Sequence, residues 1–192
     1  WQAGEAEIRR LNQEGYIEFK DGVPSKRYYE DEEGAEHDPF YCFMDSEWSS
    51  TSEAGKSELN SLLGNDHGFD TVKPTRLIRT LIQSITKIRE SDIVLDFFAG
   101  SGSTGDALFA QNSSDSGNRR FILVQLPEIL DINDKDQKTM AEFCLRLGLP
   151  LRISEVTKAR LRQAGVNLGK TNPDYGGDIG FRVFKLDTSN IR

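Results

Sequence analysis

The sequence predicts an α/β fold in which a small parallel sheet is covered by flanking helices. Two short apolar runs, residues 93–97 and 121–126, have the length and composition of buried strands. Amphipathic helical patterns lie before, between and after these runs, and such alternation is typical of parallel sheets, whose strands need crossover connections. A loop rich in Gly and Ser, residues 98–105, separates the first strand from the next helix, where ligands bind in sheets of this class.

Residues 1–70 are expected to precede the sheet as a hairpin and irregular segment, and residues 71–192 to form the sheet region itself. Residues 1–12 contain helix-forming side chains, and the alternation in GYIEFKDGVPSKRYYE predicts a hairpin that turns at Asp21-Gly22. From residue 41 to residue 70 the mixture of Ser, Thr, Gly and Asn predicts mostly irregular structure, with at most one short helix in SELNSLLG.

The second region follows a regular order of helices and strands. Pro74 suits the first turn of a helix, and apolar residues recur at helical spacing through TRLIRTLIQSIT. The strand at 93–97, the helix STGDALFAQN and the strand at 121–126 come next. Two helical stretches, 137–147 and 154–164, and a last strand at 181–186 complete the predicted fold.

Composition and charge restrict the functional class. Of the 192 residues 29% are charged and 36% are hydrophobic, as in a globular protein. No apolar run is long enough to span a membrane and no secretion signal opens the chain, which favours a cytoplasmic protein. A net charge of −7 makes this chain alone a poor binder of duplex phosphates. The cysteines and histidines match no zinc-ligand spacing, so we expect no metal site.

The glycine loop fits two cofactors. Gly100, Gly102 and Gly105 satisfy G-x-G-x-x-G, and glycine allows positive φ and close approach of a ligand to the backbone. A nicotinamide site would have an acid at the end of the second strand to bond the ribose hydroxyls, but here Gln125 occupies that position. A nicotinamide-dependent oxidoreductase is therefore the weaker alternative, and a turn that only packs a helix on a strand is a third interpretation.

Several segments together resemble the C-terminal part of a DNA adenine methyltransferase of the permuted beta class, and most closely the modification (Mod) subunit of type III restriction-modification systems. LDFFAGSGSTG resembles the S-adenosylmethionine loop of that family, FDTVKPTRLIRTLI the KP helix before it, and NRRFILVQLPE the second strand. ISEVTKARLRQAG and DIGFRVFKLDTSN resemble the following helix and strand. The resemblance covers nearly the whole chain. It implies a Rossmann-like S-adenosylmethionine-dependent methyltransferase fold that methylates a flipped adenine in double-stranded DNA.

The resemblance also implies roles for individual residues. Asp96 would face the ammonium group of the cofactor, and Lys73 its carboxylate. Thr104 would cap the helix or bond the ligand, and Gln125 would bond the ribose without the charge assistance that an acid gives. The complete set of expected cofactor-binding residues is Lys73, Pro74, Asp96, Phe97, Phe98, Gly100, Gly102, Thr104 and Gln125.

The family's catalytic tetrapeptide, of the D-P-P-Y type, has only two near matches here. Residues 38–41 read DPFY and follow an acidic loop, so we interpret them as a turn. Residues 172–175 read NPDY and lack a preceding buried strand, and Asn-Pro opening a turn is the simpler interpretation. In the permuted order that the resemblance implies, the tetrapeptide would precede residue 1, beyond a target-recognition domain that is expected to be missing from this chain. No catalytic residue is therefore predicted, the isolated chain is expected to be inactive, and a non-catalytic cofactor-binding or assembly module is the main alternative.

Two sets of surface residues and one strand edge suggest partners. The basic residues Arg76, Arg79, Lys87, Arg89, Lys158, Arg160 and Arg162 either border DNA or form solvated helix faces, and the second explanation is the commoner one. Trp48 and the Tyr28-Tyr29 pair either stack on bases or are partly buried. The edge of strand 93–97 is expected to self-associate or to be covered by residues 1–60. A restriction (Res) subunit is a further partner that the resemblance implies.

Overall fold

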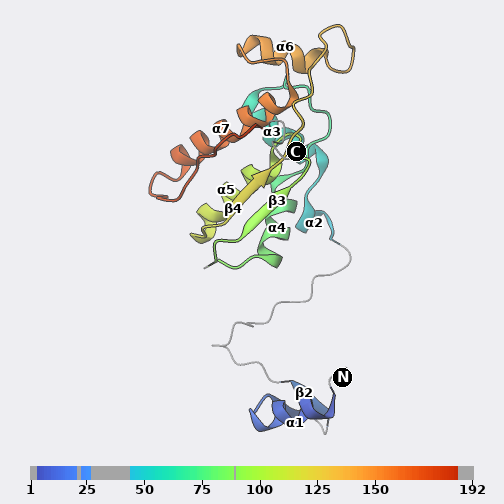
Figure 1. The fold of residues 1–192 in the computed structure, drawn as a ribbon, viewed down its shortest axis with the longest axis vertical. Coiled ribbons are helices and arrows are strands. Elements are labelled where there is room, and N and C mark those ends of the chain that lie inside the picture. Colours follow the sequence, from blue (N-terminus) through green and yellow to red (C-terminus); the bar gives the residue numbers. More distant parts are fainter. Residues whose placement is uncertain (1–3, 21–22, 27–43, 89, 186–192) are drawn as a thin grey trace, which may run out of the picture. The chain divides into compact units, whose positions relative to one another are not determined.

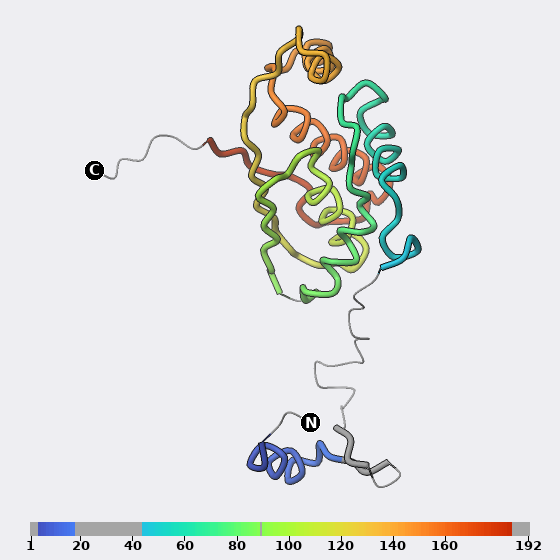
Figure 2. Tube along the Cα trace, turned by 90° about the vertical axis from the view of Figure 1, so that its right-hand side faces the viewer, coloured from blue at the N-terminus to red at the C-terminus, as the bar shows by residue number. Residues whose placement is uncertain are grey.

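The computed structural model describes residues 4–20, 23–26, 44–88 and 90–185 (Figures 1 and 2). The chain divides into two compact units, Trp1–Cys42 and Phe43–Arg192. In the first, helix α1 (Glu5–Gln13) is followed by strands β1 (Ile17–Lys20) and β2 (Val23–Lys26), which pair antiparallel. The predicted N-terminal helix and hairpin are confirmed. The expected turn residues, Asp21-Gly22, lie outside the described part of the chain.

The second unit begins with helices where irregular structure was predicted. The 12-residue helix α3 starts at Ser52, where the Thr51 hydroxyl accepts a hydrogen bond from the Ala54 N–H, 3.2 Å away. Leu59 is fully buried, and Gly55 has no Cβ where the backbone of residues 72–74 approaches the helix. The sequence signal was misleading because Gly55 serves close packing and does not end a helix. The elements of this unit are α2 (Ser46–Ser49), α3 (Ser52–Leu63), α4 (Thr75–Ile85), β3 (Ile93–Asp96), α5 (Ser103–Asp115), β4 (Arg120–Leu123), α6 (Lys138–Arg146) and α7 (Ile153–Thr171).

Strands β3 and β4 form a small parallel sheet, so the unit has a mixed α/β fold as predicted. Ile93 lies opposite Arg120, and Asp96 lies opposite Leu123. The predicted third strand is wrong, because residues 181–185 form no strand. The chain before and within that segment runs alongside α7 instead (Figure 1). Ile179 lies against Gly165 of α7, and Phe181 packs on the cluster that contains Leu161 and Ala164 of the same helix. The backbone of that segment therefore does not pair with the sheet.

One face of the sheet is covered by helices and the other is exposed. Phe121 and Leu123 of β4 pack against Phe109 of α5 and against Leu161 and Ala164 of α7. On the opposite face the apolar side chains of Ile93, Leu95 and Ile122 are each about half exposed, at 52%, 49% and 51%.

A second apolar cluster lies between α6 and α7. Its buried members are Leu130, Met140, Ala141, Phe143, Cys144 and Val156. Together the two clusters fix α7 against both α5 and α6, so that the N-terminal half of α7 lies behind the loop that follows β3 (Figure 1). Within the described residues, no helix combines the length and the apolar character that a membrane span requires.

Candidate functional site around the glycine loop

The glycine loop connects the end of β3, at Asp96, to the start of α5, at Ser103. Gly100 and Gly102 have φ angles of +50° and +82°, a left-handed conformation that favours glycine. The Gly102 N–H donates to the Ala99 carbonyl at 2.7 Å, and the Ala99 N–H donates to the Val124 carbonyl at 3.0 Å. The loop is therefore a tight turn that is tied to the end of the neighbouring strand.

Asp96 supports this turn with both of its carboxylate oxygens. Oδ1 accepts a hydrogen bond from the Phe98 N–H at 2.9 Å, and Oδ2 accepts one from the Thr104 hydroxyl at 2.6 Å. The carboxylate thus connects the strand end to the first turn of α5. Thr104 does not cap the helix, since no side chain caps α5 and its hydroxyl is bonded to Asp96.

Gln125 contacts the loop from the end of β4. Its Oε1 accepts a hydrogen bond from the Gly100 N–H at 2.8 Å, and its Nε2 donates to the Leu126 carbonyl at 3.3 Å. The structure therefore brings Asp96, Gly100, Thr104 and Gln125 together through hydrogen bonds. In this arrangement the side chains of Asp96 and Gln125 hold the loop itself.

The outer side of the loop is open. Among the described residues, a Cβ atom built on Gly100 would meet only the Phe98 carbonyl oxygen, at 3.7 Å, so none of their side chains fills the space there. Phe97 and Phe98 are 63% and 86% exposed beside it. An open backbone turn flanked by two exposed aromatic rings can accept a flat, partly apolar ligand.

The inner side of the loop rests on α7. The Thr157 hydroxyl donates to the Gly100 carbonyl at 2.6 Å. One turn later on α7, the Arg160 guanidinium donates from Nη1 to the hydroxyls of Ser101 and Ser103 at 3.2 and 2.7 Å, and from Nε to Asp106 at 2.9 Å. Burial raises the pKa of the Asp106 carboxyl, and the positive charge of Arg160 opposes that shift.

Arg160 was predicted to border DNA or to lie on a solvated face, and both interpretations are wrong because it is fully buried. The sequence contains a signal that identifies it. Arg160 is a cation within the mostly apolar face of α7, because the buried positions of this helix follow one helical stripe: Val156, Thr157, Arg160, Leu161, Ala164 and Gly165. Of the other basic candidates, Arg76, Lys87 and Arg162 are exposed, Arg79 donates to Gln111 at 3.0 Å, Lys158 pairs with Glu155, and Arg89 lies outside the described residues.

The Lys73-Pro74 pair lies at the start of α4, packed against Gly55 of α3. The Lys73 side chain is exposed, and it makes no hydrogen bond or ion pair with the glycine loop within the described part of the chain. The connection between these two segments is indirect. The Thr75 N–H donates to Glu58 Oε2 at 2.9 Å, and the same oxygen lies 3.9 Å from Arg160 Nη2.

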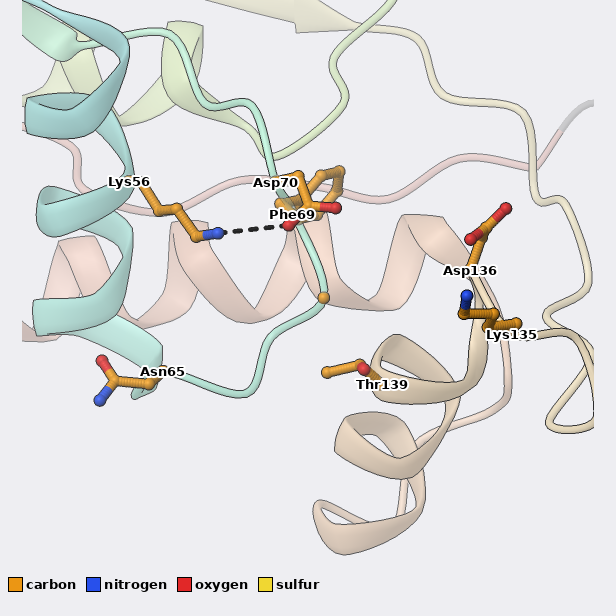
Figure 3. A pocket seen from close by; sticks show the side chains of 8 residues that line it. Lys56, Asn65, Phe69, Asp70, Lys135, Asp136 and Thr139 are labelled. Atoms are coloured by element: carbon orange, nitrogen blue, oxygen red, sulfur yellow. Dashed lines mark hydrogen bonds and ion pairs between the residues drawn. The ribbon is translucent and has the colours of Figure 1, made fainter.

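A polar cavity of about 260 Å³ lies elsewhere, between α3 and the start of α6 (Figure 3). Lys56 points at Asp70 and pairs with it at 3.2 Å, while Lys135, Asp136 and Thr139 form the opposite wall (Figure 3). None of the predicted cofactor-binding residues lines this cavity. It is thus separate from the glycine loop.

The structure describes one of the two near matches to the catalytic tetrapeptide and one of the aromatic candidates. Residues 172–175 form a turn after α7, as predicted, with the Tyr175 N–H donating to the Asn172 carbonyl at 3.1 Å. Residues 38–41 and the Tyr28-Tyr29 pair lie outside the described residues. Trp48 is 61% exposed, so the expectation that it is partly buried is wrong.

Comparison with known proteins identifies several relatives of this chain. The chain is 30% identical over 191 residues to the type III restriction-modification enzyme StyLTI Mod subunit of Salmonella typhimurium. The aligned region covers 98% of this chain and 27% of that relative. The chain is 33% identical over 184 residues to the EcoPI Mod subunit of Escherichia phage P1, covering 91% and 26%. With the type II methyltransferase M.KpnI of Klebsiella pneumoniae it shares 30% identity over 131 residues, 67% of this chain and 28% of the relative.

The chain thus spans about a quarter of the length of the curated relatives that it matches. Residues 9–126, which include β3, the glycine loop and β4, match the DNA methylase family. Because this match extends over more than half of the sequence, the chain belongs to the DNA methylase family.

Proposed function

We propose that the glycine loop binds S-adenosylmethionine and that this chain is the cofactor-binding part of a DNA adenine methyltransferase. The observation that carries the proposal is the left-handed turn at Gly100 and Gly102, which is open at Gly100 and lies between a parallel strand and a helix in a member of the DNA methylase family. The β3–β4 sheet is then part of a larger Rossmann-like sheet. The family match favours methyl transfer over a nicotinamide-dependent oxidoreductase.

Each predicted site residue has a place in this proposal. The carboxylate of Asp96 attracts the ammonium group of the cofactor, while Lys73 attracts its carboxylate. Phe97 and Phe98 provide an apolar surface. Gln125, two residues after the end of β4, bonds a ribose hydroxyl. The glycines, Thr104 and Pro74 shape the walls around these contacts.

In the whole protein the substrate is double-stranded DNA, from which an adenine is flipped so that its exocyclic amine meets the methyl group. The names of the two Mod relatives support a restriction subunit as partner. We propose that the 192-residue chain alone binds the cofactor without transferring the methyl group, because residues 172–175 form only a turn. The cytoplasmic location stays a prediction.

The self-association expected from the sequence also stays a proposal. Within the described residues β3 pairs only with β4, and its apolar side chains Ile93 and Leu95 are about half exposed. An unpaired strand edge beside an exposed apolar face favours contact with a second copy in the isolated chain.

Calorimetric titration with S-adenosylmethionine, and in parallel with NAD, tests the cofactor. We expect the first to bind and the second not to bind, and the reverse result would contradict the proposal. The substitution Gly102→Ala should abolish binding, because it places a Cβ at a φ of +82°, 3.3 Å from Thr157. Gly148→Ala is the matched control: it creates similar strain, at a φ of +64°, where no atom lies within 4 Å.

Methyl transfer from labelled S-adenosylmethionine to duplex DNA tests the division of roles. We expect no transfer by this chain alone. Transfer by the isolated chain would show that a catalytic group lies within it and would direct attention back to residues 172–175.

A further inference from the structure

The glycine loop and the start of α4 both contribute to the proposed cofactor site. A single buried side chain contacts the first directly and is connected to the second through Glu58. The first is the glycine loop, where Arg160 Nη1 bonds the hydroxyls of Ser101 and Ser103 on either side of Gly102. The Nε atom of the same guanidinium bonds Asp106, one turn into α5, at 2.9 Å. These bonds fix the position of the loop relative to α7.

The second segment is the start of α4, immediately after Lys73-Pro74. Arg160 Nη2 lies 3.9 Å from Glu58 Oε2, and this oxygen also accepts the hydrogen bond from the Thr75 N–H at 2.9 Å. One carboxylate oxygen of α3 therefore stands between the guanidinium and the first N–H of α4. Arg160 and Glu58 together connect the two segments.

The chemistry of this connection suits an arginine. Arg160 has no exposed surface, and its partners Asp106 and Glu58 retain 16% and 33% side-chain exposure. A buried ion pair adds little net stability compared with an apolar replacement, but the planar guanidinium sets directions for several bonds at once. A lysine ammonium at the same place carries its charge on a single nitrogen and cannot donate from separate nitrogens to Asp106 and to the two serine hydroxyls.

We propose that Arg160 is a positioning residue that sets the separation of the glycine loop and the start of α4, and thereby the affinity for S-adenosylmethionine. The inference rests on the proposed cofactor site. Arg160 does not touch the ligand. It acts through Ser101, Ser103 and Glu58, which hold the glycine loop and the start of α4, the two walls of the proposed site.

The chain contains a matched control for this inference. Arg119 is also buried and pairs with an aspartate of α5, Asp115, at the same distance of 2.9 Å. Asp115 is nine residues after Asp106, which places the two ion pairs about 13 Å apart along the helix. Substitution of Arg119 therefore disrupts a comparable buried pair that is remote from the loop.

Titration of S-adenosylmethionine into the 192-residue chain and its Arg160→Met, Arg160→Lys and Arg119→Met variants tests the inference. We expect the Kd to rise at least tenfold in R160M, to rise by a smaller factor in R160K, and to stay within twofold in R119M. Folding of each variant is checked by circular dichroism. Equal Kd values for folded R160M and R119M would overturn the inference.

Amide exchange gives a readout that needs no cofactor. We expect exchange at the amides of residues 72, 73 and 75 and of residues 100–103 to accelerate together in R160M and to remain unchanged in R119M. Unchanged exchange at either wall would overturn the inference. If the wild-type chain binds no S-adenosylmethionine while this coupled change is seen, the cofactor proposal fails and the connection between the two walls stands.

Two milder substitutions keep the test decisive if R160M does not fold. Ser103→Ala removes the 2.7 Å bond to the loop and leaves the Asp106 pair intact. Glu58→Gln keeps an acceptor for the Thr75 N–H but removes the charge that faces Arg160. We expect each to raise the Kd about two- to fivefold, and no change in either would overturn the inference.

Discussion

The two faces of the β3–β4 sheet differ in what covers them. The inner face contributes Phe121 and Leu123 to a cluster with Phe109 and Leu161 from two helices. On the outer face, Leu95 and its neighbours have a similar apolar character but remain about half exposed. Apolar composition alone therefore does not show which strand residues stabilise this chain. The packing of α5 and α7 decides it.

The substitution Phe109→Ala should have the largest effect. Phe109 is 3% exposed and meets the Phe121 ring edge-on at 5.5 Å. Its removal leaves a cavity and is expected to reduce the free energy of unfolding by about 3–5 kcal/mol, measured by denaturant titration. Ile122→Ala on the outer face is the control and should cost no more than about 1 kcal/mol. Equal losses would contradict the contrast between the faces.

The substitution Gly105→Ala should have an intermediate effect. A Cβ atom at this position of α5 would lie 2.5 Å from Leu161 Cδ2 and 3.1 Å from Leu123 Cδ1, inside the covered cluster. Overpacking costs about 1–3 kcal/mol, and it opposes the gain in helix propensity of about 1 kcal/mol. Thermal unfolding should show a net loss, whereas Ser114→Ala on the exposed side of α5 should show none. A stabilised Gly105 variant would mean that the cluster tolerates the added carbon.

Polar substitution of the outer face should change association more than stability. In a Leu95→Gln, Ile122→Gln double variant we expect unfolding within about 1 kcal/mol of the wild type, because both side chains are already half exposed. Sedimentation velocity should show less self-association than for the unsubstituted chain. An unchanged sedimentation profile from a self-associating parent would exclude this face as the contact.

The smallest expected effect is a pH dependence that arises in the interior of the second unit. His67 is fully buried, its Nδ1 accepts from the Phe69 N–H at 3.0 Å, and its Nε2 lies 2.9 Å from Asn60 Oδ1, so Nε2 carries the proton of the neutral ring. Burial lowers the pKa of His67 from its ordinary 6.5, and the positive charges of Lys56 and Arg160 add to this shift.

Below about pH 6.5 the unfolded chain therefore binds a proton that the folded chain does not bind, and stability falls as the pH drops toward the lowered pKa. Denaturant titration of His67→Gln across this window should show a weaker decline than the wild type. A decline of equal slope would assign the effect to other groups.

The two strands of the sheet could be predicted from sequence because short apolar runs bounded by polar turns are typical of strands. The 93–97 and 121–126 runs are strands in the structure, at Ile93–Asp96 and Arg120–Leu123, since each run has one side chain in two directed at the helices. The last run, at 181–186, is also rich in apolar residues. It forms no strand over residues 181–185, because a strand needs a hydrogen-bonded neighbour and this segment follows a helix.

The candidate site could be located from sequence, but its supports could not. The glycines, Asp96 and Gln125 occur in recognisable order around the loop, and the structure joins them by hydrogen bonds. Arg160 and Glu58 are distant in sequence from the loop, and the apolar stripe that marks Arg160 as buried does not show which residues it contacts. Only the packing of α7 and α3 shows that they meet behind it.

The Gln125 side chain has a consequence for how a sugar is recognised. Its carbonyl oxygen accepts from the Gly100 N–H, and its amide nitrogen donates one hydrogen to the Leu126 carbonyl. The second amide hydrogen is therefore the donor that remains for a nucleoside bound at the proposed site. A carboxylate accepts a hydrogen bond from a ribose hydroxyl, whereas an amide nitrogen donates one to the oxygen of that hydroxyl. Such a pocket should accept a sugar whose hydroxyl has been converted to a small ether, a change that a carboxylate pocket rejects.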